Sequence, residues 1–380
     1  MDVEQIRQHY PGLQASIYLN TGGFGQNSHQ LQAAIDAGYR KLYQDHMPPI
    51  EWYLHTVKAA GVAQTKLAAF LGADTDEIAL TMSTADGYAR VLGGLRWQAG
   101  DEVAITSEEN SMPHTAVLGL ADREGAVVKV VELDPDPAVL LDRIEQALTP
   151  RTRMICFSHV TTDTGFQVPA KEVCALARQR GILTLWDGCQ AVGQLPIDLN
   201  DMGCDFYASN CYKWLLGPIG TGFLYVRQEA IQTLKPLLCP HSPQGSAGQY
   251  KMGTPASTLY LGVEATLDFM TSIGGSRAIA AEADRKAEAL RASFNGIPGV
   301  QILGSQRPET RSSIVAFAIE GMDGEEISHA LKTRWNITQR GTYVSRPSGV
   351  RISVAFYNNE AEIDALVEAV TVLASAAGHS

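Results

Sequence analysis

Short apolar runs alternate with helical segments from about residue 60 to residue 230, and this alternation constrains the fold more than any other feature. The expected strands lie at residues 102–106, 126–133, 153–158, 182–186, 205–208 and 222–226. When a helix separates two strands, it carries the chain back across the sheet, so the strands run parallel. The sequence therefore predicts an α/β fold, with a largely parallel sheet and helices on both faces.

Helical spacing of apolar residues marks several segments between and around the strands. These expected helices lie at residues 57–70, 139–148 and 170–180. The third is followed by Gly181, and glycine commonly terminates helices. A further apolar stretch at residues 361–377 carries three acidic residues at helical spacing. It therefore predicts a surface helix and not a membrane span.

The chain changes character after residue 236. Residues 236–255 are rich in proline and glycine and predict a long irregular segment. Helical spacing then runs from residue 259 to residue 294. The strands expected after it lie at residues 300–303, 313–319 and 350–356. We predict a large domain of residues 16–258 and a smaller α+β domain that combines residues 1–15 with residues 259–380.

Composition excludes several classes of partner. Acidic residues outnumber basic ones by 41 to 30, and the formal net charge is −11, so neither nucleic acid nor a membrane is expected. The six cysteines form no C-x-x-C pair and the nine histidines no H-E-x-x-H motif, so no metal site is expected. Most cysteines lie in apolar segments, which is typical of reduced thiols, and no secretory signal is visible. We expect a cytoplasmic enzyme.

Polar residues follow several expected strands, where open α/β sheets bind ligands. Lys213 comes soon after the strand at 205–208, between Tyr212 and Trp214 and before a glycine-rich turn. Burial there would favour the neutral amine, which is the form that attacks carbonyl groups in Schiff-base chemistry. For any single lysine, a side chain that reaches water is the commoner arrangement.

Asp187 directly follows the strand at 182–186 and begins the sequence Asp-Gly-Cys-Gln. Taken alone, such an aspartate more often caps the next helix than takes part in catalysis. In pyridoxal-phosphate enzymes, however, a carboxylate at such a place keeps the pyridine nitrogen protonated. Lys213 follows about one β-α-β step later, which makes the two residues candidates for one site.

Two further patches are weaker signals. Residues 158–165, which include Thr162, join a strand end to polar residues and glycine, as in an ordinary capped turn. Residues 81–87, which include Thr84 and Ala85, lead into a helix. The free N–H groups of a helix N-terminus can hold a phosphate, although any Ser/Thr cap has this pattern.

Taken together, the order and spacing of these residues resemble the class V aminotransferase family of fold-type I pyridoxal-phosphate enzymes. The resemblance covers nearly the whole chain, from residues 18–25 (Tyr-Leu-Asn-Thr-Gly-Gly-Phe-Gly) to Arg351 and residues 357–360. Its most specific pieces are residues 187–190 and 212–214. It implies a mostly parallel sheet of the seven-stranded type with helices on both faces, in a large cofactor-binding domain beside the smaller α+β domain.

The resemblance implies pyridoxal 5'-phosphate as the cofactor and no metal. It implies that Lys213 is joined to the cofactor through a Schiff base and that Asp187 pairs with the pyridine nitrogen. Other residues are implied to contact the ring oxygen (Thr162 and Gln190) and the phosphate (Thr84, Ala85 and Tyr212). Thr254 resembles a family residue that reaches the phosphate of the neighbouring subunit, which implies a homodimer.

Within the family, the chain is most similar to cysteine/cystine C–S lyases, which are close relatives of cysteine desulfurases. Residues 20–25, residues 212–214 and the pair Arg340 and Arg351 carry this likeness. It implies that Asn20, Arg340 and Arg351 bind an amino-acid substrate. Two guanidinium groups suit a substrate carboxylate, because the planar fork binds it in a bidentate way. For arginines without such a motif, pairing with surface acids is the commoner role.

Two features depart from the family pattern. In desulfurases, a loop between the two arginine positions carries the cysteine that accepts sulfur as a persulfide, whereas residues 341–347 contain no thiol here. Persulfide relay is not expected, because valine and serine cannot act as thiolate nucleophiles. Where many relatives stack a histidine or aromatic ring on the cofactor, residues 108–110 are Glu-Glu-Asn. We take Glu109 as that residue and predict that it contacts a polar or cationic group of the substrate.

The sequence thus predicts a C–S lyase that acts by α,β-elimination on cysteine, cystine or an S-substituted cysteine, without a persulfide cysteine. Aminotransferase and amino-acid epimerase activities stay open, because both share the initial removal of the α-proton. A cysteine desulfurase is less favoured, since Thr162 stands where desulfurases tend to have asparagine. Retention of Lys213, Asp187 and both arginines argues against an inactive cofactor-binding paralogue.

Overall fold

A seven-stranded sheet forms the centre of the computed structural model, which describes residues 1–44, 48–238, 245–254, 256–343 and 347–378. Its strand order is β2-β8-β7-β6-β5-β3-β4. The strands are β2 (Ile78–Thr81), β3 (Glu102–Thr106), β4 (Val127–Val131), β5 (Thr152–Ser158), β6 (Leu183–Asp187), β7 (Phe206–Asn210) and β8 (Gly222–Val226). The pairs from β4 to β7 are parallel, while β8 is antiparallel to both neighbours. The expected mostly parallel α/β sheet is confirmed.

The central strands are buried on both faces because nearly all of their side chains are apolar. Every residue of β3, β7 and β8 is buried, which is typical of strands covered by helices on both sides. The edge strand β4 differs, because Val127 and Val130 are exposed. Burial on both faces therefore holds the central strands in position. Residues that directly follow these strands are for the same reason well placed to form a site.

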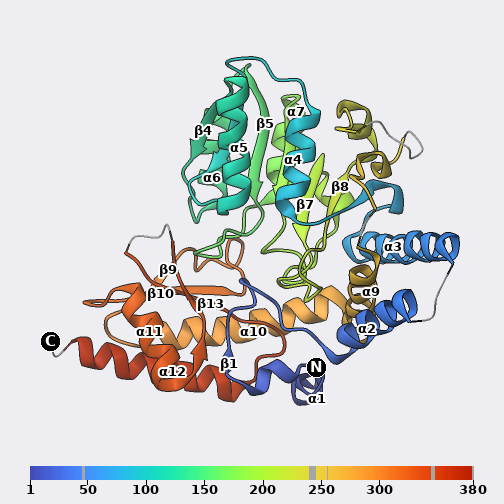
Figure 1. Cartoon of the computed structure of the whole chain (residues 1–380). Helices are drawn as coiled ribbons and strands as arrows, with labels where there is room; N and C mark the ends of the chain where they lie inside the picture. Colours follow the sequence, from blue (N-terminus) through green and yellow to red (C-terminus); the bar gives the residue numbers. More distant parts are fainter. Residues whose placement is uncertain (45–47, 239–244, 255, 344–346, 379–380) are drawn as a thin grey trace.

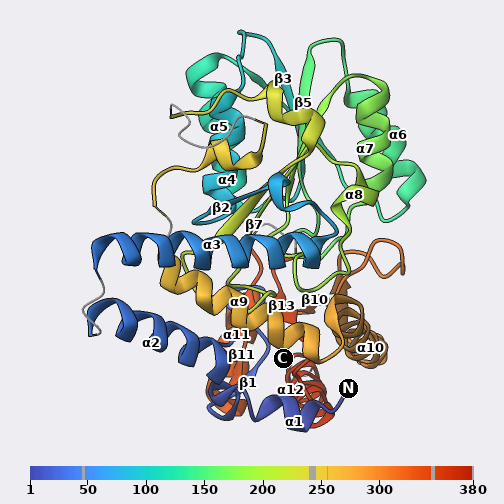
Figure 2. The ribbon, with the colours of Figure 1, turned by 90° about the vertical axis from the view of Figure 1, so that its right-hand side faces the viewer.

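Helices cover both faces of this sheet, and Figure 2 shows the resulting three layers. On one face, α4 (Thr84–Gly94) and α5 (Ser111–Glu124) share a core with residues of β3, β7 and β8. On the other face, a second core joins strand residues to α3, α6, α7 and α8. Those helices span Pro49–Leu71, Pro137–Ala147, Ala170–Gln179 and Leu199–Met202, respectively.

A four-stranded antiparallel sheet lies below the large one in Figure 1, and its order is β12-β13-β10-β9. Its strands are β9 (Val300–Leu303), β10 (Ile314–Ile319), β12 (Arg340–Gly341) and β13 (Val350–Ser353). The helices that share its core are α10 (Gly275–Asn295), α11 (Gly324–Trp335) and α12 (Glu360–Ala377). A separate parallel pair joins β1 (Ile17–Tyr18) to β11 (Ile337–Thr338).

The start of the chain packs on its C-terminal part. In α1 (Val3–Arg7), Arg7 donates hydrogen bonds to the backbone oxygen of Tyr357 at 2.9 Å and to Glu362 at 2.8 Å. Near the predicted domain boundary, α9 (Ser257–Ser272) contacts both α2 (His29–Tyr43) and α3. The division of the chain into residues 16–258 and the remainder stays a prediction.

Several segments differ from expectation. The helical region from 259 to 294 is two helices, α9 and α10, because Gly274 and Gly275 between them adopt φ angles of 113° and 71°. α3 begins at Pro49 and not at residue 57, and β13 ends at Ser353. The 3-10 helices are η1 (Pro11–Gln14), η2 (Thr75–Glu77), η3 (Gln228–Thr233) and η4 (Ala247–Tyr250). The last of these interrupts the expected irregular segment, in which residues 239–244 and 255 lie outside the described part.

The C-terminal segment is the helix α12, as expected, and Asp364 and Glu368 are exposed on it. Its third acidic residue, Glu362, is buried, where it accepts the hydrogen bond from Arg7. Across the described residues, we find no helix that is long and apolar enough to cross a membrane.

Gly193 packs closely against the segment that contains Lys213. Its φ is 91°, and a Cβ there would lie 2.4 Å from the carbonyl carbon of Trp214. Gly181 also has a positive φ, 67°, but nothing lies within 4 Å of the place its Cβ would take. We expect Gly181→Ala to cost about 1–2 kcal/mol of unfolding free energy, from the backbone conformation alone. Gly193→Ala should cost more, because the Trp214 backbone must also move.

Urea denaturation of the two variants would measure this difference, and amide hydrogen exchange of residues 211–216 would locate it. Faster exchange there in Gly193→Ala, but not in Gly181→Ala, is the expected result. Equal destabilisation and equal exchange in both variants would contradict the close packing.

Candidate active site

The predicted site residues follow neighbouring strands whose carboxyl ends meet at one edge of the large sheet. β6 ends at Asp187 and β7 ends shortly before Lys213. β5 ends at Ser158, which is the register partner of Asp187, and Thr162 follows it. Open α/β sheets bind ligands at this kind of edge, so the placement favours a single site built from several loops.

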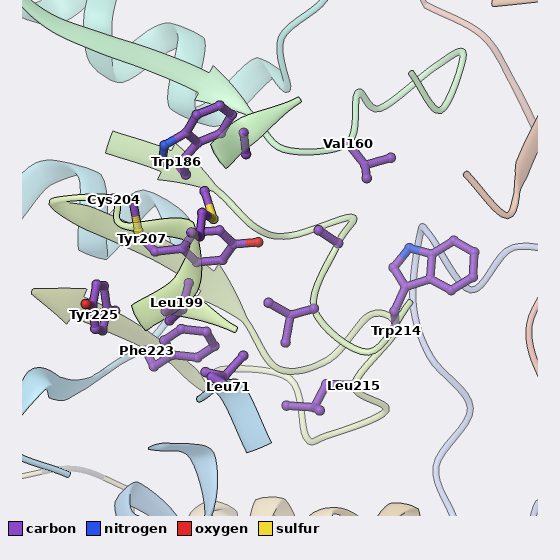
Figure 3. Packing of buried hydrophobic residues seen from close by; sticks show 14 of the residues in the cluster. Leu71, Val160, Trp186, Leu199, Cys204, Tyr207, Trp214, Leu215, Phe223 and Tyr225 are labelled. Carbon is purple, nitrogen blue, oxygen red and sulfur yellow. The ribbon is translucent and has the colours of Figure 1, made fainter. Parts of the chain in front are cut away.

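A layer of large buried side chains holds these strand ends. Trp186 and Tyr207 are fully buried, and Figure 3 shows them beside Phe223, whose ring is parallel to that of Tyr207 at 6.5 Å. Gly188, the neighbour of Asp187, fits against this layer because a Cβ there would lie 2.0 Å from a Tyr207 ring carbon. Any other residue at 188 would displace the turn that carries Asp187.

Asp187 and Lys213 meet at the thiol of Cys189. The backbone N–H and the thiol of Cys189 donate to the Asp187 carboxylate, at 2.8 and 3.4 Å, and Lys213 Nζ donates to Cys189 Sγ at 3.2 Å. Burial raises the pKa of Asp187, while the charge of Lys213 opposes that rise. Burial also raises the pKa of the Cys189 thiol to about 12, so this thiol stays protonated at neutral pH.

Arg351, from β13, is a buried cation beside this cluster, with 1% of its surface exposed. It donates from Nη1 to the backbone oxygen of Thr162 and from Nη2 to Oδ1 of Asn20, both at 2.9 Å. Its Nε has no hydrogen-bond partner among the described residues. Burial, and then the charge of Arg340, lowers its pKa to about 9, so it stays protonated at neutral pH. A buried guanidinium with an unpaired N–H is suited to bind an anion.

Arg340 differs from Arg351 because it has a carboxylate partner. Its Nη2 donates to Oδ1 of Asp163 at 2.6 Å, and its guanidinium lies 4.0 Å from the ring centroid of Tyr343. Arg340 and Arg351 are direct partners across β12 and β13. Arg340 Nη2 also donates to the backbone oxygen of Thr162 at 3.2 Å. The two arginines predicted to bind substrate therefore lie side by side and share a neutral partner, and Arg340 has a carboxylate partner in addition.

Residues 20–25 connect the two halves of the site. Gln190 donates from Nε2 to the backbone oxygen of Gly22 at 2.9 Å. A Cβ on Gly22 would lie 2.7 Å from Gln190 Oε1 and 3.2 Å from Arg351 Cζ. The segment passes between these side chains only because Gly22 has no side chain, and this route brings Asn20 to Arg351.

Thr84 and Ala85 begin α4, as the pattern predicted. Ser83 is the N-cap, and its hydroxyl accepts a hydrogen bond from the backbone N–H of Asp86 at 3.2 Å. The hydroxyl of Thr84 is buried and, within the part of the chain that the structure describes, unpaired. An unpaired hydroxyl at a helix N-terminus fits a phosphate. The phosphate oxygens would accept hydrogen bonds from this hydroxyl and from the free backbone N–H groups.

Two predicted cofactor residues lie apart from this hydrogen-bonded set. The Tyr212 ring stacks on that of Phe24 at 5.8 Å, and burial raises the pKa of its phenol, so the hydroxyl keeps a proton to donate. Thr254 is exposed and lines a cavity of about 440 Å³ together with Met82 and Arg90. Contacts of Tyr212 and Thr254 with a phosphate stay predictions, as do the roles of the other predicted residues.

Glu109 is not oriented as expected. Its carboxylate accepts hydrogen bonds from the backbone N–H and hydroxyl of both Thr106 and Ser158, at 2.6 to 3.0 Å. Burial raises its pKa to about 7, and these hydrogen bonds oppose the rise. Both oxygens are thus used to join the ends of β3 and β5, which argues against a substrate contact.

Asn110 is the residue of the 108–110 segment that lies beside the cluster. Its Nδ2 donates to Cys189 Sγ at 3.0 Å. The sequence did not single out Asn110, because a short polar run carries no periodicity from which side-chain direction can be read. Asp163 was likewise part of a recognised patch but was given no role, since its partner Arg340 is distant in sequence.

His159, directly after β5, is a buried neutral side chain behind the site. Its Nδ1 lies 3.0 Å from the Tyr207 hydroxyl, and its ring packs edge-to-face against that of Trp186. Burial lowers its pKa to about 4, below the value of about 6.5 for an unfolded chain. Its stabilising contribution is therefore present above pH 6.5 and is lost as the pH falls towards 4.

We expect wild-type protein to lose about 3 kcal/mol more unfolding free energy between pH 7 and pH 4 than a His159→Gln variant does. Urea denaturation at a series of pH values would measure the difference. His329→Gln, at an exposed helical position, is the matched control and should follow the wild type. A pH dependence in His159→Gln that matches the wild type would contradict a buried neutral imidazole.

Known proteins with similar sequences cover almost the whole chain. Residues 17–366 match the model of the family described as aminotransferase class-V. The isopenicillin N epimerase of Streptomyces clavuligerus is 32% identical, over 86% of this chain and 87% of that protein. A probable cysteine desulfurase of Methanothermobacter thermautotrophicus is 28% identical, over 98% of each.

Solved structures agree with this match. A mutant of C-DES with glycine covalently linked to its PLP cofactor has a TM-score of 0.88 and 26% identity, over 96% of this chain and 98% of that one. The complex of the cystine C–S lyase C-DES with its reaction product cysteine persulfide has a TM-score of 0.87 and 26% identity, over 95% and 99%. The family match and the similar fold are both consistent with a ligand site at the carboxyl ends of the strands of the large sheet.

Proposed function

The chain belongs to the aminotransferase class-V family of pyridoxal-phosphate-dependent enzymes, and on that premise we propose that it is a C–S lyase. It acts by α,β-elimination on cysteine, cystine or an S-substituted cysteine. The observation that carries the proposal is the cluster of Lys213, Asp187 and a protonated Cys189 thiol beside the buried Arg351. The cluster supplies an amine that can move protons, a carboxylate and an anion site, and its own thiol, Cys189, is held protonated.

The residues present fit the cofactor. Bound pyridoxal phosphate supplies an electron sink for the negative charge that develops at the α-carbon of an amino acid. Lys213 would hold the cofactor covalently through its amine, and Asp187 would hold a proton on the pyridine nitrogen. Thr84, whose buried hydroxyl is unpaired within the described residues, and the N–H groups at the start of α4 would bind the phosphate. Thr162 and Gln190, whose side chains are 3.4 Å apart, would contact the ring oxygen.

The substrate carboxylate binds Arg351 and Asn20, which already form one hydrogen-bonded unit. The amine of Lys213 would take the proton from the α-carbon. As the C–S bond breaks, its electron pair would leave with the sulfur, which takes up a proton as hydrogen sulfide, a thiol or a persulfide. The remaining 2-aminoacrylate would tautomerise to an imine, which water hydrolyses to pyruvate and ammonia.

Elimination is favoured over sulfur transfer by the state of the thiols. Transfer needs a thiolate at the substrate sulfur atom, and burial holds Cys189 protonated. The loop between the two arginines contains no cysteine, and its residues 344–346 lie outside the described part. Cys239, in the proline- and glycine-rich segment, also lies outside it and is the alternative acceptor to test.

Epimerisation is the second candidate, and similarity to isopenicillin N epimerase favours it. An epimerase must return a proton to the opposite face of the α-carbon, which calls for a second acid. Asn110 is the side chain found beside Cys189, and an amide does not serve as such an acid. Elimination needs no second acid at the α-carbon, so the described side chains support it better.

We propose further that the enzyme is a cytoplasmic homodimer in which Thr254 reaches the neighbouring subunit. Met82 and Met252 are exposed apolar residues that line the same cavity as Thr254, and exposed Ile219 adjoins it. A second copy of the chain would remove these side chains from water. Sedimentation equilibrium tests the dimer.

Five free, buried cysteines in the described part support a reducing compartment.

Lys213→Ala should purify without covalently bound cofactor and should lose turnover. Borohydride reduction followed by peptide mass spectrometry measures the covalent linkage, which should appear on Lys213 in the wild type and be absent in the variant. Lys235→Ala, at an exposed position, is the control and should retain both linkage and activity. Full turnover in Lys213→Ala would refute the assignment.

Replacing each of the six cysteines singly should leave the products unchanged, with one pyruvate formed for each sulfur released from cysteine or cystine. Cys189→Ala is the most informative variant, because this thiol contacts Lys213. The assay measures pyruvate, alanine, sulfide and the configuration of recovered substrate. Alanine in place of pyruvate, together with a protein-bound persulfide that one variant lacks, would establish a desulfurase. D-amino acid without pyruvate would establish an epimerase.

A further inference from the structure

Asp163 is a fully buried carboxylate that binds the segment carrying Arg340. One of its oxygens accepts a hydrogen bond from Arg340 Nη2, and the other accepts one from the backbone N–H of Tyr343, both at 2.6 Å. Glu108 fixes the backbone at Asp163, because its carboxylate accepts a hydrogen bond from the backbone N–H of Asp163 at 2.7 Å. The position of this carboxylate is therefore set by the strand-end turn and not by a flexible side chain.

The pairing divides two adjacent arginines into different roles. Arg340 is paired with Asp163, and Tyr343 covers its guanidinium. Arg351, directly opposite in the sheet, donates to two neutral oxygens and has no carboxylate partner among the described residues. The Nε of each arginine is unpaired in that part of the chain, so the difference between the two lies in the carboxylate. A guanidinium fork already engaged by a buried carboxylate cannot offer the same N–H groups to a second anion without leaving that carboxylate unpaired.

We propose that Asp163 is a specificity-determining residue that disfavours substrates whose S-substituent carries a net negative charge. Arg351 binds the α-carboxylate, and Asp163 together with its partner Arg340 disfavours a further group with an uncompensated negative charge. Repulsion by the buried Asp163 and the engagement of Arg340 both act against such a substrate. The preferred substrates are cysteines whose S-substituent is neutral overall, which includes cystine, because the second half of cystine carries an ammonium group beside its carboxylate. This inference rests on the proposed function only in taking an amino acid as the substrate.

The test compares ligands of nearly equal shape that differ in charge. S-carbamoylmethylcysteine and S-carboxymethylcysteine differ by an amide in place of a carboxylate, and the ratio of their kcat/KM values measures the preference. Wild-type enzyme should prefer the neutral compound. Asp163→Asn keeps the shape and an acceptor oxygen but frees the charge of Arg340, so the preference should fall by at least tenfold. Asp163→Glu should restore part of it.

Arg340→Gln in the Asp163→Asn background supplies the matched control. If the freed guanidinium attracts the second carboxylate, removing it should abolish the gain for S-carboxymethylcysteine. Arg340→Gln alone leaves Asp163 without its partner and should raise the relative kcat/KM for the cationic S-aminoethylcysteine. This variant provides a separate test if Asp163→Asn does not fold.

Binding measured without turnover separates this inference from the lyase proposal. Glutamine and glutamate have no leaving group, and both should perturb the cofactor absorbance when they bind. A wild-type preference for glutamine that falls at least tenfold in Asp163→Asn supports the inference even if no pyruvate is formed from any cysteine. Unchanged ratios in folded, cofactor-loaded Asp163→Asn and Arg340→Gln would overturn it, whether or not the enzyme is a lyase.

Discussion

Buried charge at the carboxyl edge of the large sheet is the constraint on which the rest of this structure depends. Asp163, Asp187 and Arg351 have at most 1% of their surface exposed. An ion removed from water costs several kcal/mol unless a partner compensates for it. Each of the three is met by groups from a distant part of the chain or a rigid turn. The interactions that form the site are therefore also interactions that hold distant parts of the chain together.

The N-terminal segment shows how a distant stretch of chain becomes part of this edge. Gly22 passes between Gln190 and Arg351, where no side chain fits, and Asn20 accepts a hydrogen bond from Arg351. The same stretch forms a bridge to Ser353 and thereby joins the small antiparallel sheet. Movement of the small sheet relative to the large one would therefore move Arg351 relative to Lys213.

Sequence patterns predicted the strands well, because a strand buried on both faces is a continuous apolar run, as in β3 and β8. They did not reveal the break between α9 and α10, since the surrounding apolar spacing remains helical and only the glycine backbone changes direction. Motif spacing singled out Asp187 and Lys213, which the fold brings together at Cys189. It did not reveal that Glu109 joins the ends of β3 and β5, and it gave Asp163 no role, because the direction of a side chain in a polar turn depends on partners supplied by other strands.

The thiol at Cys189 links the electrostatics of the site to its chemistry. Its contacts are an amine, a carboxylate and an amide, and a lone thiol beside an amine would normally lose its proton more readily. Burial and the negative charge of Asp187 outweigh Lys213 here and raise its pKa to about 12. Asp187 thus helps to keep the nearby thiol protonated. If the enzyme acts by the elimination that we propose, such a thiol would not capture the sulfur that leaves the substrate.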